Sequence, residues 1–168
     1  MDTAFQILKD QSQYVNRISY SIDSLVLFLK NDINIYIVSF QGFNNTTYES
    51  MKTSGQLDIL DESLKKQLYE LYILQNISHE TYITTRDDYF DEIETIVASF
   101  PIPVPFSFIK KSPYNQFLWD NLDRKDVLLK LNSWRSLKTN FFRTTYRDFK
   151  DILNKTESIL QMIEDNND

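Results

Sequence analysis

The chain has 168 residues, 42% of them hydrophobic and 14% aromatic, so it can fold as one domain around a substantial core. Its net charge of −6 argues against nucleic-acid binding, which needs a dominant basic face. Two glycines and four prolines are too few for the turns of an all-β domain, and the lack of cysteine excludes disulfides, thiolate metal sites and cysteine nucleophiles.

A seven-residue repeat of apolar side chains predicts a first long helix over residues 3–40. The repeat consists of Leu8, Val15, Ile22, Leu29 and Tyr36. Gly42 and the asparagines that follow it provide helix-stop chemistry. The polar residues within 30–34 weaken the last turns, so the pattern also allows a kink there.

A short helix and a second long helix are predicted next. Thr46 and Glu49 have the spacing of a capping box for a helix that ends at Ser54, where Gly55 is expected to adopt a positive φ angle. Asp61 is a suitable N-cap for a helix over residues 61–100. The middle of that helix is more polar on its apolar face, which predicts a loosely packed or partly hydrated layer.

Alternating prolines interrupt the helical pattern over residues 100–111, so this connector is expected to be extended, close to polyproline II. Ser112 and Pro113 then have the pattern of a helix start, which predicts a short helix through Trp119. Asp123 is a suitable N-cap for a third long helix over residues 123–164.

These elements predict an all-α fold, specifically an elongated antiparallel bundle of about three long helices with two short capping helices. We expect the whole chain, residues 1–168, to form a single domain. No stretch reaches 18 uninterrupted apolar residues, so we expect no bilayer-spanning segment in this chain.

The run from Tyr48 to Tyr72 resembles an uncharacterised bacterial family whose members carry a single N-terminal membrane anchor. The resemblance rests on a short helix, the segment 53–60 (Thr-Ser-Gly-Gln-Leu-Asp-Ile-Leu) and a following leucine-rich helix; residues 122–160 share the family's long helical character. The resemblance implies a helical fold and tethering to a bacterial membrane, although this chain lacks the anchor. It implies no catalytic residues, because the family has no assigned activity.

The motifs of common enzymes are missing. His79 is the sole histidine, and neither the second histidine of a zinc-peptidase helix nor the Glu-x-x-His pair of a di-iron bundle accompanies it. No glycine-rich loop could cradle a phosphate. The acidic residues crowded within 87–94 are read as a solvated helix face rather than a cation site. We therefore expect a non-enzymatic protein with no metal and no cofactor.

Charge is unevenly distributed along the chain. Acids dominate residues 49–94 and bases dominate residues 124–150. The favoured interpretation is that neighbouring helices or subunits present complementary faces. The alternative is that the basic stripe binds anionic lipid or an acidic partner.

The connector carries the candidate interaction surface, formed by Phe106, Phe108, Lys110 and Lys111. Aromatic rings followed by two lysines suit contact with a membrane surface. The favoured interpretation of the segment is nevertheless a stiff connector whose rings plug the end of the bundle.

The sequence favours a helical interaction or sensory domain, tethered to a membrane in its parent context, that self-associates or binds another protein. The main alternative is a small-molecule sensor with a pocket beside the polar middle of the second long helix. An enzyme that uses carboxylates alone is a third, weaker hypothesis.

Overall fold

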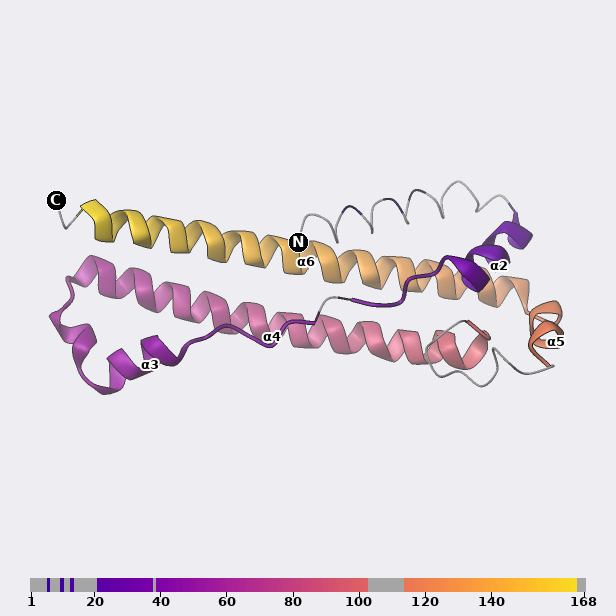
Figure 1. Cartoon of the computed structure of the whole chain (residues 1–168), viewed down its shortest axis with the longest axis horizontal. Helices are drawn as coiled ribbons and strands as arrows, with labels where there is room; N and C mark the ends of the chain where they lie inside the picture. Colours follow the sequence, from indigo (N-terminus) through magenta and orange to yellow (C-terminus); the bar gives the residue numbers. More distant parts are fainter. Residues whose placement is uncertain are drawn as a thin grey trace. The chain divides into compact units, whose positions relative to one another are not determined.

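The computed structural model describes residues 21–37, 39–102 and 114–165, together with Gln6, Asp10 and Gln13. These residues contain helices and no strand, which confirms the predicted all-α class. In chain order the helices are α2 (Ile22–Asn31), α3 (Thr46–Thr53), the 3₁₀ turn η1 (Gln56–Ile59), α4 (Glu62–Ser99), α5 (Asn115–Asp120) and α6 (Arg124–Asp165). Figure 1 shows their connections.

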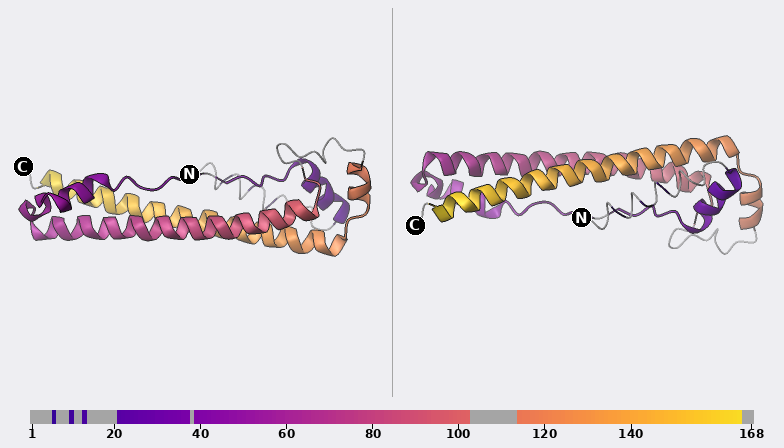
Figure 2. Two further views of the ribbon diagram at one scale, coloured as in Figure 1. Left: turned by 90° about the horizontal axis from the view of Figure 1, so that it is seen from below. Right: turned by 90° about the horizontal axis from the view of Figure 1, so that it is seen from above.

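The two long helices, α4 and α6, pack side by side in opposite directions, as the three views of Figures 1 and 2 agree. The hydrogen bonds between the two helices also show that they run antiparallel. Lys155 near the end of α6 bonds to Glu70 near the start of α4, whereas Lys130 near the start of α6 bonds to Ser99 at the end of α4. The antiparallel arrangement of long helices is therefore confirmed.

Both long helices begin where the sequence predicts. The Asp61 carboxylate accepts a hydrogen bond from the Leu64 N–H at 2.9 Å, which satisfies one of the free donors at the start of α4. The Asp123 carboxylate accepts from the N–H groups of Lys125 and Asp126 at 2.8 and 3.3 Å and starts α6 in the same way. Proline at position 101 lies just beyond the end of α4.

The predicted continuous first helix over residues 3–40 is wrong. Gln6, Asp10 and Gln13 are helical, but α2 ends at Asn31, and residues 33–37 and 39–45 form no helix. The polar run at residues 30–34 ends the helix instead of kinking it. At the end of that run and just beyond it, the main-chain carbonyls of Asn34 and Ile35 accept hydrogen bonds from buried side chains of α6 and α4, and a helix would have used those carbonyls internally.

The short helices follow the prediction in part. Gly55 has φ +74°, as expected from its position after α3. The capping box is wrong, because Asn45 occupies the N-cap and makes no side-chain capping bond; the Asn44 side chain accepts from the Thr46 N–H at 3.1 Å instead. Helix α5 starts at Asn115, and the predicted start at Ser112 and Pro113 lies outside the described residues.

The described chain divides into two compact units. Unit 1 comprises Met1–Val38 and Thr85–Phe142; unit 2 comprises Ser39–Thr84 and Arg143–Asp168. Helices α4 and α6 each contribute to both. The expected single domain and its elongated form stay predictions.

Unit 1 contains the larger buried core. The Trp134 and Phe28 rings lie 6.0 Å apart between centroids, and both residues are almost fully buried. The remaining buried members of this core are Leu25, Leu29, Tyr89, Ile93, Ile96, Phe100, Ile102, Trp119, Val127 and Leu131. Helices α2, α4, α5 and α6 all contribute to it.

Candidate functional site

The predicted interaction surface of Phe106, Phe108, Lys110 and Lys111 lies outside the described residues. Its role stays a prediction. The described part of the chain offers five other features that bear on function: a buried polar cluster, an aromatic cluster, a cavity and two exposed apolar faces.

The buried polar cluster of unit 1 holds the non-helical segment after α2. The Tyr89 hydroxyl donates to the Ile35 carbonyl at 2.7 Å and accepts from the Trp134 indole N–H at 3.3 Å. Burial raises the pKa of the Tyr89 phenol, and the indole hydrogen bond lowers it to a smaller extent. The hydroxyl therefore remains protonated and bridges α4, α6 and the segment.

Lys138 belongs to the same cluster. Its side chain is 2% exposed, its Nζ donates to the Asn34 carbonyl, and Nζ lies 5.4 Å from the centroid of the Trp134 ring. Burial lowers the pKa of the Lys138 ammonium to about 8. Lys138 lies within the basic stretch 124–150, yet it faces inward. The sequence signal for this was its place between Trp134 and Phe141 at helical spacing.

An aromatic cluster in unit 2 surrounds the histidine. The Phe40 ring packs against His79, Tyr82 and Phe149, with centroid distances of 5.9, 5.4 and 4.8 Å. The Tyr82 hydroxyl also accepts from the Phe40 N–H at 3.0 Å. A Cβ on Gly42 would lie 3.3 Å from His79 Nε2. His79 thus has a packing role in this cluster.

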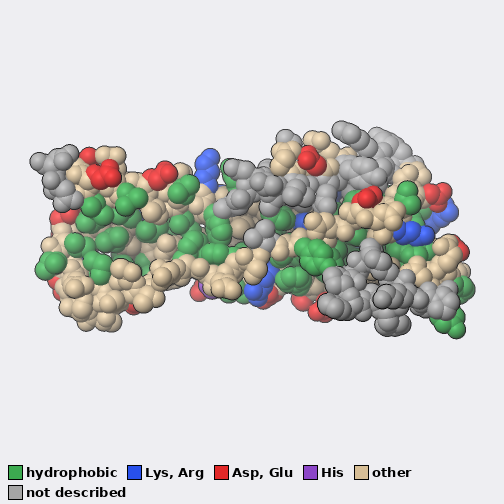
Figure 3. Space-filling model, viewed as in Figure 1, with side chains coloured by type: hydrophobic (Ala, Val, Ile, Leu, Met, Phe, Trp, Pro, Cys, Tyr) green, Lys and Arg blue, Asp and Glu red, His purple; other side chains and the backbone are tan. Residues whose placement is uncertain are grey.

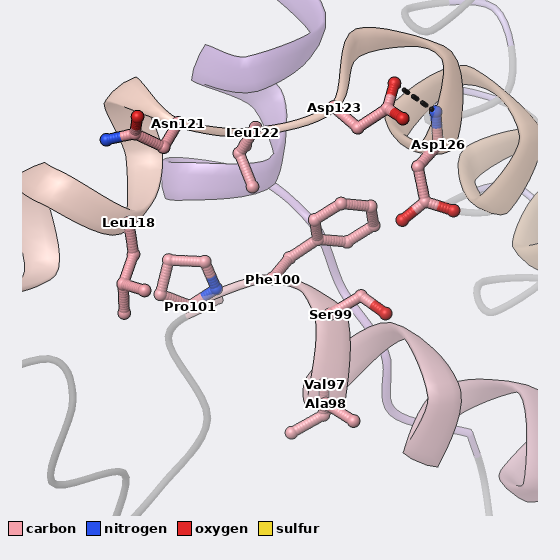
Figure 4. A pocket seen from close by; sticks show the side chains of 10 residues that line it. All are labelled: Val97, Ala98, Ser99, Phe100, Pro101, Leu118, Asn121, Leu122, Asp123 and Asp126. Carbon is pink, nitrogen blue, oxygen red and sulfur yellow. Dashed lines mark hydrogen bonds between the residues drawn. The ribbon is translucent and has the colours of Figure 1, made fainter.

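A cavity of about 290 Å³ lies in unit 1, where α4 ends and α6 begins. Figure 4 shows Phe100 and Leu122 facing the space, with the carboxylates of Asp123 and Asp126 at its rim. Both carboxylates already have partners within the fold, because Asp123 caps α6 and Asp126 lies 3.7 Å from Lys130 Nζ. The cavity differs in place from the predicted pocket beside the middle of the second long helix.

The acidic run does not gather a cation site. Among the described residues, no three His, Cys, Asp or Glu side chains lie close enough to hold a metal ion. Asp87, Asp88, Asp91 and Glu94 are all exposed, as expected for a solvated face. None of the helices that the structure describes combines the length and apolar composition needed to cross a bilayer.

Charge pairing between the long helices involves a residue outside the predicted basic stripe. Lys155 Nζ lies 2.5 Å from a Glu70 carboxylate oxygen and also bonds to Gln67. These contacts lower the pKa of the Glu70 carboxyl, chiefly through the Lys155 hydrogen bond. Within the stripe itself, Arg124 and Arg147 pair with Asp23 and Asp148.

The α6 face is an exposed apolar stripe in unit 2, formed by Leu153, Leu160 and Ile163. Their exposed fractions are 55%, 54% and 38%. With the half-buried Thr156 they recur at intervals of three, four and three residues, the spacing of a coiled-coil seam. Figure 3 shows hydrophobic side chains gathered over the parts of α6 and α4 that belong to unit 2.

The α4 face is a second exposed apolar stripe in unit 2, formed by Tyr69, Ile73 and Ile77, with exposed fractions of 54%, 36% and 56%. Ile73 stands nine residues, or two and a half helical turns, before the buried Tyr82, so the two side chains leave α4 on opposite sides. The α4 face therefore points away from the core of its unit.

No protein-family model, curated protein or solved structure matches the chain.

Proposed function

We propose that this protein is a non-enzymatic helical interaction domain that binds an amphipathic helix of a partner protein along the α6 face. The observation that carries the proposal is the exposure of Leu153 and Leu160 at coiled-coil spacing. Leucines fixed on a rigid helix and left in water gain free energy when a second helix covers them.

The geometry of the face suits a helix. Leu153 and Ile163 are ten residues apart, which corresponds to about 15 Å or nearly three turns. Lys150, Glu157 and Glu164 flank the stripe at seven-residue intervals, the positions at which coiled coils place partner-selecting charges. A partner helix with apolar residues at matching spacing and a basic flank opposite the two glutamates fits this surface best.

The buried polar groups support a structural rather than a catalytic interpretation. Tyr89 and Lys138 direct their polar atoms to main-chain carbonyls of the segment after α2. Both side chains are therefore engaged in holding the fold. Membrane tethering in the parent protein is part of the proposal, and the resemblance of Tyr48–Tyr72 to an anchored family supports it.

Site-specific photo-crosslinking in cells that naturally express the protein tests the α6 face. A photoreactive residue replaces Leu160, and the control replaces Asn154, which is exposed on another side of the same helix. We expect a discrete crosslinked product at position 160, weakened by Leu153→Ser and little changed by Asn154→Ser. Equal products at positions 160 and 154, or no product at 160, would contradict the proposal.

The cavity in unit 1 favours a second function, the binding of a small molecule. The carboxylates of Asp123 and Asp126 at its rim suit a small organic cation. Saturation-transfer NMR with a panel of small amines, repeated on Asp126→Asn, tests this alternative. The α6 face remains the stronger candidate because both carboxylates already take part in contacts of the fold.

A further inference from the structure

The α4 face has a symmetric pattern. Lys66, Tyr69, Ile73, Ile77 and Glu80 follow one another at intervals of three, four, four and three residues, so the spacing reads the same from either end. The average interval matches one helical turn, and the row therefore runs along the helix axis. Its centre is Ile73, its ends carry opposite charges, and the positions between are apolar.

We propose that the α4 face pairs with the α4 face of a second copy of this chain, in antiparallel orientation, about a twofold axis at Ile73. This arrangement places Ile73 against its own equivalent and Tyr69 against the partner's Ile77. Lys66 then lies beside the partner's Glu80, and the symmetry makes this ion pair twice. The same patch on both copies is complementary to itself, as a twofold interface requires.

The charges decide the direction of pairing. A parallel pair of α4 helices would place Lys66 beside its own equivalent and Glu80 beside its own equivalent, and like charges at such positions are unfavourable. The antiparallel pair replaces both repulsions with attractions. Lys66 can form the ion pair with the partner's Glu80. Its side chain is 73% exposed, and its Nζ lies 3.9 Å from the Glu70 carboxylate of its own chain, a long distance for an ion pair.

The side chains of the face are suited to an interface. Tyr69 and Ile77 are each more than half exposed, and the backbone beneath them is a regular helix. Covering them removes apolar surface from water without reordering the chain. Since three apolar residues and two ion pairs form a small contact, we expect a weak, concentration-dependent dimer.

The inference deepens the proposed interaction role by naming one partner, and it uses a surface separate from the α6 face. Failure of the α4 pairing would leave the α6 proposal standing, because photo-crosslinking at position 160 reports on the α6 face alone.

Disulfide trapping tests the register, and the chain suits it because it contains no natural cysteine. Ile73→Cys is expected to form a covalent dimer under mild oxidation, because the twofold axis brings the two positions together. Lys66→Cys alone and Glu80→Cys alone should form no covalent dimer, whereas a mixture of the two should crosslink. Positions 66 and 80 are about 21 Å apart along the helix, well beyond the Cα separation of about 7 Å that a disulfide spans.

Sedimentation velocity over a range of concentrations gives the second readout. Lys66→Glu and Glu80→Lys should each weaken the dimer by roughly tenfold, because each turns two attractions into repulsions. Combining them should restore it, and Ile73→Glu should abolish it with helicity unchanged by circular dichroism. A wild-type chain that stays monomeric to high concentration, or a Lys66→Cys variant that crosslinks to itself as well as the mixture does, would overturn the antiparallel pairing.

Discussion

Lys138→Met tests how the buried polar cluster contributes to stability. In the wild type, burial holds the pKa of the Lys138 ammonium at about 8, against 10.5 for an exposed lysine. The unfolded chain therefore binds a proton more tightly than the folded chain does. Below pH 8 the folded state carries the whole penalty of a buried charge, about 3 kcal/mol at ~1.4 kcal/mol for each unit of pKa difference.

The sign of this linkage predicts an unusual pH dependence. Between the folded pKa and the unfolded pKa, the folded chain loses its proton first, so the free energy of unfolding rises with pH. From pH 8 to pH 9.5 the gain should be about 2 kcal/mol. The comparison is limited to pH 9.5 and below because of the tyrosines. Burial raises the pKa of folded Tyr89, so its ionisation in the unfolded chain would add a second pH dependence to the free energy of unfolding at higher pH.

Methionine has nearly the length of lysine and no charge, so Lys138→Met removes the ionisation and leaves the Asn34 carbonyl without its donor. The lost hydrogen bond and the removed penalty oppose each other at pH 7, so the net change there should be small. Urea unfolding at pH 7, 8 and 9.5 should show the rise in wild type and its loss in the variant. Lys150→Met, at an exposed position of the same helix, is the control and should keep the rise. The same pH dependence in Lys138→Met and wild type would refute the reasoning.

Two further predictions concern other parts of the chain. Gly42→Ala should destabilise by about 2 kcal/mol in urea unfolding, because φ is +105° and the new Cβ would crowd His79. Gly55→Ala should lose about 1 kcal/mol, because φ is +74° and the new Cβ would make only an ordinary van der Waals contact, with Asp58 at 3.9 Å. Equal losses would contradict this ranking. Phe106→Ser with Phe108→Ser should abolish co-sedimentation with anionic vesicles without changing helicity, and a wild-type chain that ignores vesicles would contradict membrane contact by the connector.

The starts of the long helices could be predicted because they depend on local chemistry. Asp61 and Asp123 each precede a long apolar periodicity and accept hydrogen bonds from the first turn, an arrangement that the sequence encodes within a few residues. The end of α2 could not be predicted in the same way. Residues 33–37 continue an apolar pattern, and their non-helical state depends on Tyr89 and Lys138, more than 50 residues away in the sequence.

The exposed faces were missed for a related reason. In unit 2, α4 carries apolar residues on more than one side, and periodicity alone does not say which side meets α6. Tyr69, Ile73 and Ile77 are recognised as an outer row once Leu64 and Tyr82 are known to be buried. For Lys138 the error had the opposite sign. A lysine in a basic run is usually solvated, but this one is buried.

The two proposed contacts are compatible within one assembly, because they use separate helices of unit 2. Pairing through Tyr69, Ile73 and Ile77 would leave the α6 faces of both copies open, so the dimer would present two equivalent sites for partner helices. Two linked sites raise the effective affinity for a clustered or dimeric partner without any new contact. Ile73→Glu should therefore weaken binding to a clustered partner while leaving the affinity of a single α6 face unchanged, and this difference separates avidity from direct contact.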